Sequence, residues 1–321
     1  MKAFVTGATG FIGGHLVRKL RERGDDVVAL VRNPSKAAGL DAQLVQGDLA
    51  SEDAIRQGVA GCDAVFHVGA VYKVGIPKSE HEAMYDTNVR ATERVIDSAV
   101  DAGVARIVYV STGNVYGNTR GRAVDETYVR PQPPDFLSYY DETKYLAHQV
   151  ALDRIANGAP VIITQPGGVI GPDDPSELGN MIDQVRTGKL KMKMFPDAGF
   201  NFVYVEDIAN GILLAHDKGR IGESYNLAGP QQTIGDLVDK TAELLGKKPP
   251  RMTMPPALIK MSIPIGPVIG KLMGFPPNLG ELVKTSDGVT FWMTDQKARD
   301  ELGYTSRDFD TAMRQTLGVA Q

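Results

Sequence analysis

The start of the chain constrains the fold more than any other segment, because it combines a strand, a glycine-rich turn and a helix in that order. Residues 2–6 form a short apolar run, and the sequence TGATGFIG follows directly at Thr6–Gly13. Apolar residues then recur at helical spacing through Leu20, and Gly24 fits a helix C-cap. This order predicts the first unit of a parallel α/β sheet whose turn binds the phosphates of a dinucleotide.

Each glycine of the turn has a separate expected role. Gly7 permits the tight turn, Gly10 lets the backbone approach a pyrophosphate, and Gly13 lets the helix pack closely on the strand. The helix N-terminus adds amide donors and the positive end of the helix dipole. We therefore expect the cofactor to be contacted here by Gly7, Thr9, Gly10, Phe11, Ile12 and Gly13.

The same succession of apolar runs and helical patterns continues along the chain. The runs are continuous rather than alternating, which is typical of parallel strands covered by helices on both faces. The sequence predicts an α/β fold: a doubly wound parallel sheet of Rossmann type with a smaller, mainly helical C-terminal substrate lobe. Strands are expected at 2–6, 26–31, 43–47, 64–68, 106–110, 161–165, 202–205 and 224–227, and helices at 12–20, from Ser51, 86–102, 139–157, 176–188 and from Asp207.

A change in composition after residue 165 marks the expected boundary between two units. Prolines and glycines break regular structure there, before the helix at 176–188. We expect residues 1–165 to form the dinucleotide-binding domain, with 200–228 rejoining it. The substrate-binding lobe would then consist of 166–199 and 229–321. Its methionines suit an adaptable apolar pocket, although core packing is the simpler account of any single one.

Composition argues against several classes of function. A net charge of -4 gives no basic excess for nucleic acid. Cys62 is the single cysteine and the histidines are scattered, so we expect a reducing compartment and no metal site. The N-terminus does not resemble a signal peptide, and the apolar stretch Met261–Ile269 is too short to span a bilayer. We expect a cytoplasmic protein with a small-molecule substrate and without nucleic-acid or membrane partners.

The end of the second expected strand distinguishes NAD from NADP. An acidic residue there would bind the ribose 2′-hydroxyl of NAD, whereas an arginine would meet the 2′-phosphate of NADP. This chain has no carboxylate at that point. The planar guanidinium of Arg32 and the ammonium of Lys36 could instead bind a phosphate. Solvated surface cations are the alternative for both residues. The absence of an acidic residue at this position and the presence of two basic residues both predict NADP(H). NAD is the less favoured cofactor.

These motifs resemble the extended branch of the short-chain dehydrogenase/reductase superfamily. The turn matches the TGxxGxxG spacing of that branch, Gly47–Leu49 is similar to its adenine-contacting Gly-Asp-Leu segment, and His67–Ala70 resembles its HxAA segment. A turn-capping role is the alternative for Asp48. The resemblance implies further cofactor contacts from Asp48, Leu49, Val68, Gly69, Ala70 and Pro166.

Two later motifs carry the expected chemistry. The segment Ser111–Gly117 resembles the family's STxxVYG segment, which assigns the catalytic hydroxyl to Thr112. Tyr140 and Lys144 form a YxxxK pair, and a spacing of four on a helix puts both on one face. Tyr140 would exchange a proton with the substrate oxygen, and Thr112 would donate a hydrogen bond to it. Lys144 is expected to lower the phenol pKa from about 10 and, by resemblance, to contact the cofactor through its nicotinamide ribose. Tyr140 is also expected among the residues that contact the cofactor.

The branch contains nucleotide-sugar epimerases and dehydratases as well as reductases similar to dihydroflavonol 4-reductase. Dehydratases carry Asp-Glu after the catalytic Thr, where this chain has Gly113 and Asn114. Gln165 stands where the sugar enzymes usually have an arginine. The remaining cations for a nucleotide diphosphate are Arg186, Lys189, Lys191 and Lys193.

The sequence therefore predicts an NADP(H)-dependent oxidoreductase that reduces an aldehyde or ketone of a small, mostly apolar molecule. The alternative is an NAD(P)-dependent nucleotide-sugar epimerase. Relatives often dimerise through the helices expected here at 86–102 and 139–157, which makes a homodimer an option.

Overall fold

The centre of the molecule is a seven-stranded parallel sheet in the order β10-β6-β5-β4-β1-β2-β3. The computed structural model describes residues 1–263 and 278–320. The predicted doubly wound sheet is confirmed, because the strand order reverses its direction of growth beside β1. The strands are β1 (Lys2–Thr6), β2 (Asp26–Val31), β3 (Gln43–Gln46), β4 (Ala64–His67), β5 (Arg106–Val110), β6 (Val161–Pro166) and β10 (Ser224–Leu227).

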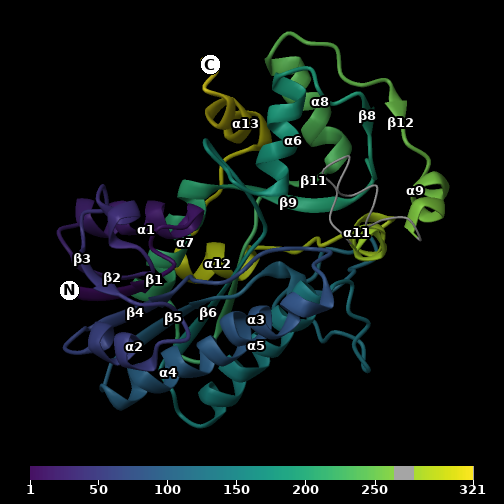
Figure 1. Cartoon of the computed structure of the whole chain (residues 1–321). Coiled ribbons are helices and arrows are strands. Elements are labelled where there is room, and N and C mark those ends of the chain that lie inside the picture. The colour runs from purple at the N-terminus through teal and green to yellow at the C-terminus, as the bar shows by residue number, and fades with distance from the viewer. Residues whose placement is uncertain (264–277, 321) are drawn as a thin grey trace.

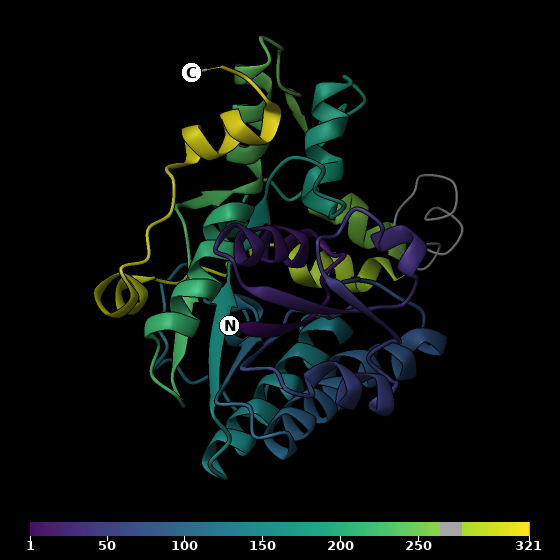
Figure 2. The ribbon, with the colours of Figure 1, turned by 90° about the vertical axis from the view of Figure 1, so that its left-hand side faces the viewer.

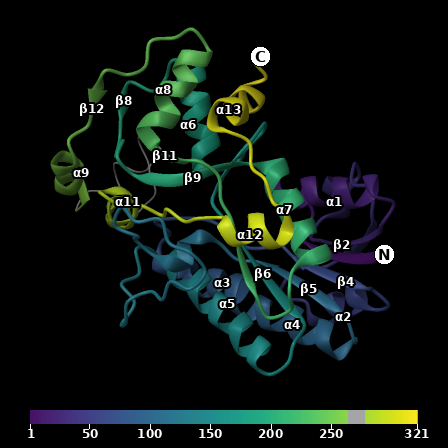
Figure 3. The same ribbon diagram turned by 180° about the vertical axis from the view of Figure 1, so that it is seen from behind.

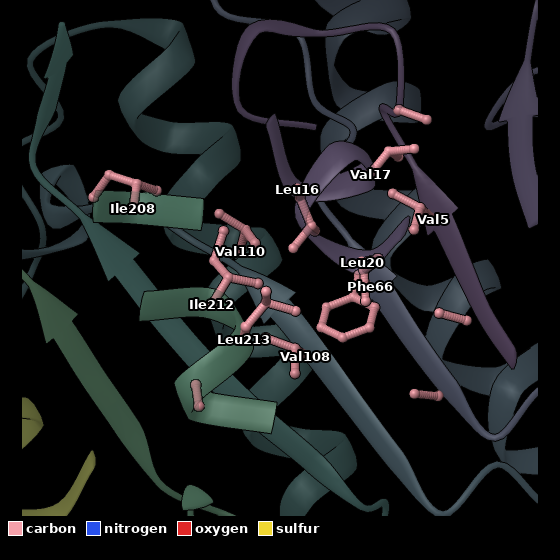
Figure 4. Close-up of a cluster of buried hydrophobic side chains, with 14 of the residues drawn as sticks. Val5, Leu16, Val17, Leu20, Phe66, Val108, Val110, Ile208, Ile212 and Leu213 are labelled. Carbon is pink, nitrogen blue, oxygen red and sulfur yellow. The ribbon is translucent and has the colours of Figure 1, made fainter. Parts of the chain in front are cut away.

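Helices cover both faces of this sheet (Figure 1). Adjacent residues of β1 show the division, since side chains alternate across a strand. Val5 packs in a cluster with Leu16, which Figure 4 shows, whereas Phe4 packs in a cluster with Ile55 on the opposite face. Figure 3 shows two helices of the first face, α7 and α12, beside each other. The first face carries α1 (Phe11–Glu22), α7 (Val205–Lys218) and α12 (Gln296–Leu302), and the second carries α2 (Glu52–Val59), α4 (Ala91–Asp101) and α5 (Tyr139–Ala156).

The helix expected at 86–102 begins earlier and contains an irregular turn. Helical structure runs from α3 (His81–Tyr85) through a π-helical turn, η3 (Asp86–Arg90), into α4. The side chain of Asn88 in this turn accepts a hydrogen bond from the Val71 amide at 2.8 Å and donates one to the Val71 carbonyl at 3.0 Å. Such turns are frequent at functional sites, and this one ties α4 to the loop after β4.

A smaller lobe follows the carboxyl ends of β6 and β10 and lies above the sheet in Figure 1. The chain begins in the large sheet, whereas its last described helix, α13, lies on the lobe (Figure 2). No helix within the described ranges is long and apolar enough to cross a membrane. Residues 264–269 of the apolar stretch noted in the sequence lie outside those ranges. The lobe contains β7 (Gly168–Ile170), α6 (Glu177–Arg186), β8 (Met192–Lys193), β9 (Gly199–Tyr204), β11 (Gln231–Thr233), α8 (Ile234–Leu244), β12 (Met252–Thr253), α9 (Pro256–Ser262), α11 (Leu279–Ser286) and α13 (Phe309–Leu317).

The strand expected at 202–205 does not rejoin the large sheet, so that part of the prediction is wrong. It forms β9, which pairs with β7 and β11 in a separate three-stranded sheet. Phe202 and Tyr204 pack with Ile170 and Ile234, and the apolar face of β9 is therefore buried inside the lobe. Of the segment 200–228, only the helix and the last strand return: α7 packs on the large sheet, and β10 pairs with β6.

Candidate active site

The turn between β1 and α1 has the geometry of an anion-binding turn. Gly7 has a φ of 69°, and its carbonyl accepts a hydrogen bond from the Gly10 amide at 2.8 Å. Gly10 is the N-cap of α1, and neither a side-chain cap nor an acidic residue in the first turn neutralises this helix end. Thr9 and Gly10 are exposed. The first amides of α1 are therefore open to a phosphate.

Close backbone contacts explain why glycines occupy this turn. A Cβ on Gly13 would lie 2.0 Å from the Gly7 carbonyl oxygen, and a Cβ on Gly7 would lie 2.7 Å from the Gly69 Cα. A Cβ on Gly69 would lie 3.1 Å from Leu49 Cδ1. The residues predicted after β3 and β4 thus lie against the turn. Phe11 faces the lobe, since its Cζ would lie 3.1 Å from a Cβ on Gly171.

The remaining predicted cofactor residues surround the same edge of the sheet. Ile12 and Val68 are half-buried and Ala70 is exposed. Asp48 accepts a hydrogen bond from the Ala50 amide at 3.0 Å, so the turn-capping role is real, and its carboxylate is also exposed. Pro166 ends β6 next to Gly113, where a Cβ would lie 3.5 Å from the Pro166 carbonyl oxygen.

Arg32 and Lys36 both lie just after β2 and both are exposed. The short helix η1 (Pro34–Ala37) begins between them, because the Asn33 side chain accepts a hydrogen bond from the Ser35 amide at 3.0 Å. Neither cation has an ion-pair partner among the residues that the structure describes. Both charges are therefore available to an anionic group at this end of the strand.

A buried polar network that sequence reasoning missed ties the glycine turn to α4. The Thr92 hydroxyl donates to the Asn88 carbonyl at 2.8 Å, so His67 Nε2 donates to Thr92 at 3.2 Å. His67 Nδ1 then accepts from the Thr6 hydroxyl at 2.8 Å, and Thr6 accepts from the Gly69 amide at 3.2 Å. This network requires the neutral imidazole. Burial lowers the pKa of His67 to about 3, and the nearby Lys144 charge contributes to this shift.

The buried histidines predict a loss of stability in mild acid. Burial, with the Lys144 charge, also lowers the pKa of His148 to about 4, and His148 Nδ1 lies 3.0 Å from Ser111 Oγ. Both pKa values are lowered on folding, so their stabilisation is complete above about pH 6.5 and is lost as the pH falls. We expect the free energy of unfolding to fall by about 2 kcal/mol per histidine between pH 7 and pH 5. Urea titrations would measure this, and His148→Gln should remove about half of the slope; an unchanged slope would contradict the assignment.

Thr112 and Tyr140 come together at the carboxyl edge of the sheet. Thr112 follows β5 and caps the short helix η4 (Gly113–Tyr116), while Tyr140 lies in the first turn of α5. Ser138 caps α5 by accepting a hydrogen bond from the Asp141 amide at 3.1 Å. The Thr112 side chain lies close enough to Tyr140 to lower the pKa of the phenol, and Tyr140 is only 7% exposed.

Lys144 lies one turn further along α5 and is buried. Its Nζ donates to the Tyr109 hydroxyl and to the Val110 carbonyl, both at 3.3 Å. An ammonium has three N–H groups, so these two bonds leave one for another acceptor.

The expected lowering of the Tyr140 pKa by Lys144 is not found in the protein alone. Burial raises the pKa of this phenol, the neighbouring Tyr72 and Tyr109 raise it further, and the Thr112 side chain opposes them. The Lys144 ammonium instead lies against Tyr109 and the end of β5. Tyr140 therefore holds its proton at neutral pH.

Asn88 is a second functional candidate that the sequence did not reveal. It is 2% exposed, and besides holding Val71 it donates to the Thr143 hydroxyl at 3.0 Å. Thr143 precedes Lys144, so Asn88 couples the loop after β4 to the helix that carries the YxxxK pair. An asparagine inside an expected helix is a poor helix former, and this was the available signal.

Comparison with known proteins shows which family the chain resembles. The model of the NAD dependent epimerase/dehydratase family matches residues 3–228. Sterol demethylase protein B of Methylococcus capsulatus is 35% identical over 267 residues, which cover 81% of this chain and 79% of that protein. A 4-hydroxy-2-methyl-3-oxo-4-farnesyl-3,4-dihydroquinoline-1-oxide ketoreductase of Stigmatella aurantiaca is 30% identical over 318 residues, or 96% and 92% of the two chains.

A solved structure shares both the fold and part of the sequence. MoeE5 in complex with UDP-glucose and NAD superposes with a TM-score of 0.78 at 25% identity, covering 99% of this chain and 98% of MoeE5. The chain belongs to the NAD dependent epimerase/dehydratase family, within the extended short-chain dehydrogenase/reductase superfamily.

Proposed function

We propose that this protein is an NADP(H)-dependent reductase that converts an aldehyde or ketone of a mostly apolar molecule into the alcohol. The observation that carries the proposal is that Thr112, which follows β5, and Tyr140, in the first turn of α5, meet at the sheet edge that also holds the glycine turn. In this proposal residues 1–165 with the returning β10 hold the cofactor, and the lobe holds the substrate. The tight contacts of Gly7 and Gly13 and the open N-terminus of α1 fit a dinucleotide.

Each residue has one role in the proposed reaction. The nicotinamide cofactor, when bound, supplies a hydride to the substrate carbon. Tyr140 donates its proton to the carbonyl oxygen, and Thr112 donates a hydrogen bond that stabilises charge on this oxygen. Lys144 has one N–H group left and would hold the nicotinamide ribose of the cofactor. Because the pKa of Tyr140 is raised, the phenol is protonated at neutral pH, and this is the form that a proton donor needs.

The cofactor preference gives a direct prediction. Arg32→Ala should weaken NADPH binding roughly 10- to 100-fold, since hydrogen bonds to charged groups contribute about 1.5–3 kcal/mol. NADH has no 2′-phosphate, so its dissociation constant should change less than about twofold. Titration of cofactor fluorescence measures both constants. Arg56→Ala is the matched control, because Arg56 is exposed and pairs with Glu52 at 2.6 Å on α2. Equal losses for NADPH and NADH would refute the 2′-phosphate assignment.

The cations expected to serve a nucleotide sugar are largely engaged elsewhere. Arg186 pairs with Asp183 at 2.6 Å, and Lys193 pairs with Asp239 at 2.6 Å. Lys191 donates to the Gly188 carbonyl at 2.8 Å. This supports an apolar substrate over a nucleotide diphosphate, which requires cations for its phosphates. The names of the Methylococcus and Stigmatella relatives, which refer to a sterol and to a farnesyl ketone, point the same way.

The rival function is an NAD(P)-dependent nucleotide-sugar epimerase, which the UDP-glucose and NAD in the MoeE5 structure favour. An epimerase retains its cofactor through an oxidation and a return reduction, whereas a reductase releases oxidised cofactor after each turnover. Absorbance of the freshly purified protein separates the two. A protein that arrives without nicotinamide and oxidises added NADPH with neutral aldehydes or ketones supports the reductase. Retained nicotinamide with interconversion of UDP-sugars supports the epimerase.

A further inference from the structure

Gly113, the residue after Thr112, is required by its surroundings and not by its backbone. It is buried at the start of η4, and its φ lies outside the left-handed region that favours glycine. A Cβ at this position would nevertheless lie 2.9 Å from Met293 Sδ and 3.1 Å from Met293 Cε. The Pro166 carbonyl oxygen, at 3.5 Å, would make only an ordinary contact. The Met293 side chain therefore occupies the space that a side chain at position 113 would need.

Met293 is held on its backbone and on its side chain. Its amide donates to the Asn201 side-chain oxygen at 2.8 Å, and its carbonyl accepts from the Asn201 side-chain nitrogen at 3.1 Å. The Met293 side chain is 1% exposed and packs in one apolar cluster with Val115, Tyr116 and Val124. A methionine is flexible in isolation, but the fixed backbone and close-packed neighbours keep this one against Gly113.

Met293 lies on the segment between α11 and α12, which connects the lobe to the large sheet. This segment also bonds to the stretch that follows η4. The Val124 amide donates to the Trp292 carbonyl at 3.1 Å, and the Val124 carbonyl accepts from the Thr294 amide at 2.8 Å. A continuous path of contacts therefore runs from β9 in the lobe, through Met293, to the loop that carries Thr112.

We propose that Met293 is a positioning residue for Thr112. The Thr112 hydroxyl accepts a hydrogen bond from the Asn114 amide at 3.3 Å, so its direction depends on the backbone that passes through Gly113. By filling the space beside Gly113, Met293 keeps this backbone in place and the hydroxyl directed at the substrate oxygen. A displacement of about 1 Å in such a group can cost about 10²-fold in rate. The inference rests on the proposed carbonyl reduction and adds a residue that acts through Gly113 without touching the substrate.

The first test removes the Met293 side chain and measures NADPH oxidation with methyl 4-formylbenzoate and other neutral aldehydes and ketones. Met293→Ala should lower kcat at least about tenfold, because Thr112 is no longer held in place. KM and the dissociation constant of NADPH should stay within about twofold of wild type. Met293→Leu keeps most of the volume and should retain kcat within about threefold.

The matched control is Met313→Ala, which removes another fully buried methionine, on α13 in the lobe. It should shift the urea midpoint as Met293→Ala does and leave kcat within about twofold of wild type. Wild-type kcat in Met293→Ala, or an equal loss of kcat in Met313→Ala, would overturn the inference and leave the reductase standing. Absence of turnover with any carbonyl compound in the wild type would overturn the proposed function, and the inference with it.

The second test exchanges volume between the two positions. Gly113→Ala places a methyl group on the Met293 sulfur, whereas Met293→Ala makes room for that methyl group. The loss of kcat in the double variant should therefore be at least about threefold smaller than the product of the two single losses. The urea midpoint of the double variant should likewise exceed the value expected from adding the two single shifts, which is a readout that needs no substrate. Additive effects in both measurements would show that Met293 does not act through Gly113.

Discussion

Tyr140→Phe is expected to lower kcat/KM for carbonyl reduction about 10²- to 10⁴-fold, which is the usual contribution of a positioned general acid. The substitution removes the phenol hydroxyl and leaves the ring against Tyr72. NADPH affinity should stay within about twofold of wild type, because the glycine turn and Lys144 are untouched. Steady-state assays and fluorescence titration of NADPH measure the two effects separately.

The matched control for this variant is Tyr139→Phe. Tyr139 is the next tyrosine of α5, but its ring stacks on His81 with the ring centres 3.7 Å apart. Turnover should therefore survive the loss of its hydroxyl. The raised pKa of Tyr140 adds a pH criterion, since a phenol that loses its proton only above about pH 10 keeps reduction insensitive to its ionisation at neutral pH. Wild-type turnover by Tyr140→Phe would disprove the mechanism.

Local sequence signals were sufficient where a residue type has a direct geometric consequence. Gly13 is required because a Cβ would collide with the Gly7 carbonyl, and the continuous apolar run of β1 reports burial on both faces. The catalytic role of Thr112 came from the resemblance of its segment to the family's STxxVYG motif, and the Tyr140–Lys144 pair came from its spacing of four on a helix. These features depend on neighbours in sequence or on a motif that can be matched locally.

The sequence did not predict in the same way which distant segments pack against each other. The pattern of β9 reads as a buried strand, and nothing in it says that Phe202 packs with Ile170 in the lobe instead of joining β6. The π-helical turn at Asn88 is invisible to a 3.6-residue period. The pKa of Tyr140 is raised first by burial, which depends on tertiary packing, and Lys144 points at Tyr109 and Val110 instead.

A buried ion pair next to Tyr140 was also not predicted from the sequence. Breaking it should have a large effect on the free energy of unfolding. Arg130 binds both carboxylate oxygens of Asp141 at 2.8 and 2.7 Å, and their side chains are 5% and 2% exposed. Arg130 also donates to the Asp135 carbonyl at 2.6 Å, while Asp141 accepts from the Leu137 amide at 2.8 Å. The pair therefore fastens the irregular loop before α5 to the first turn of that helix.

Arg130→Met should cost about 3–5 kcal/mol of the free energy of unfolding, because it leaves the Asp141 charge buried without its partner. Replacing both residues, as Arg130→Met with Asp141→Leu, should recover part of this loss, since a buried pair of apolar residues needs no compensation. The matched control is Arg154–Asp97, a pair on the outer side of α5 at 2.7 Å with side chains 31% and 49% exposed. Arg154→Met should cost at most about 1 kcal/mol. Urea unfolding measures all three variants, and equal losses for the two single variants would show that burial of the Arg130 pair does not determine its effect.

Because Asp141 adjoins Tyr140, a loosened first turn should also lower kcat more than it raises KM, which a purely global loss of stability would not do.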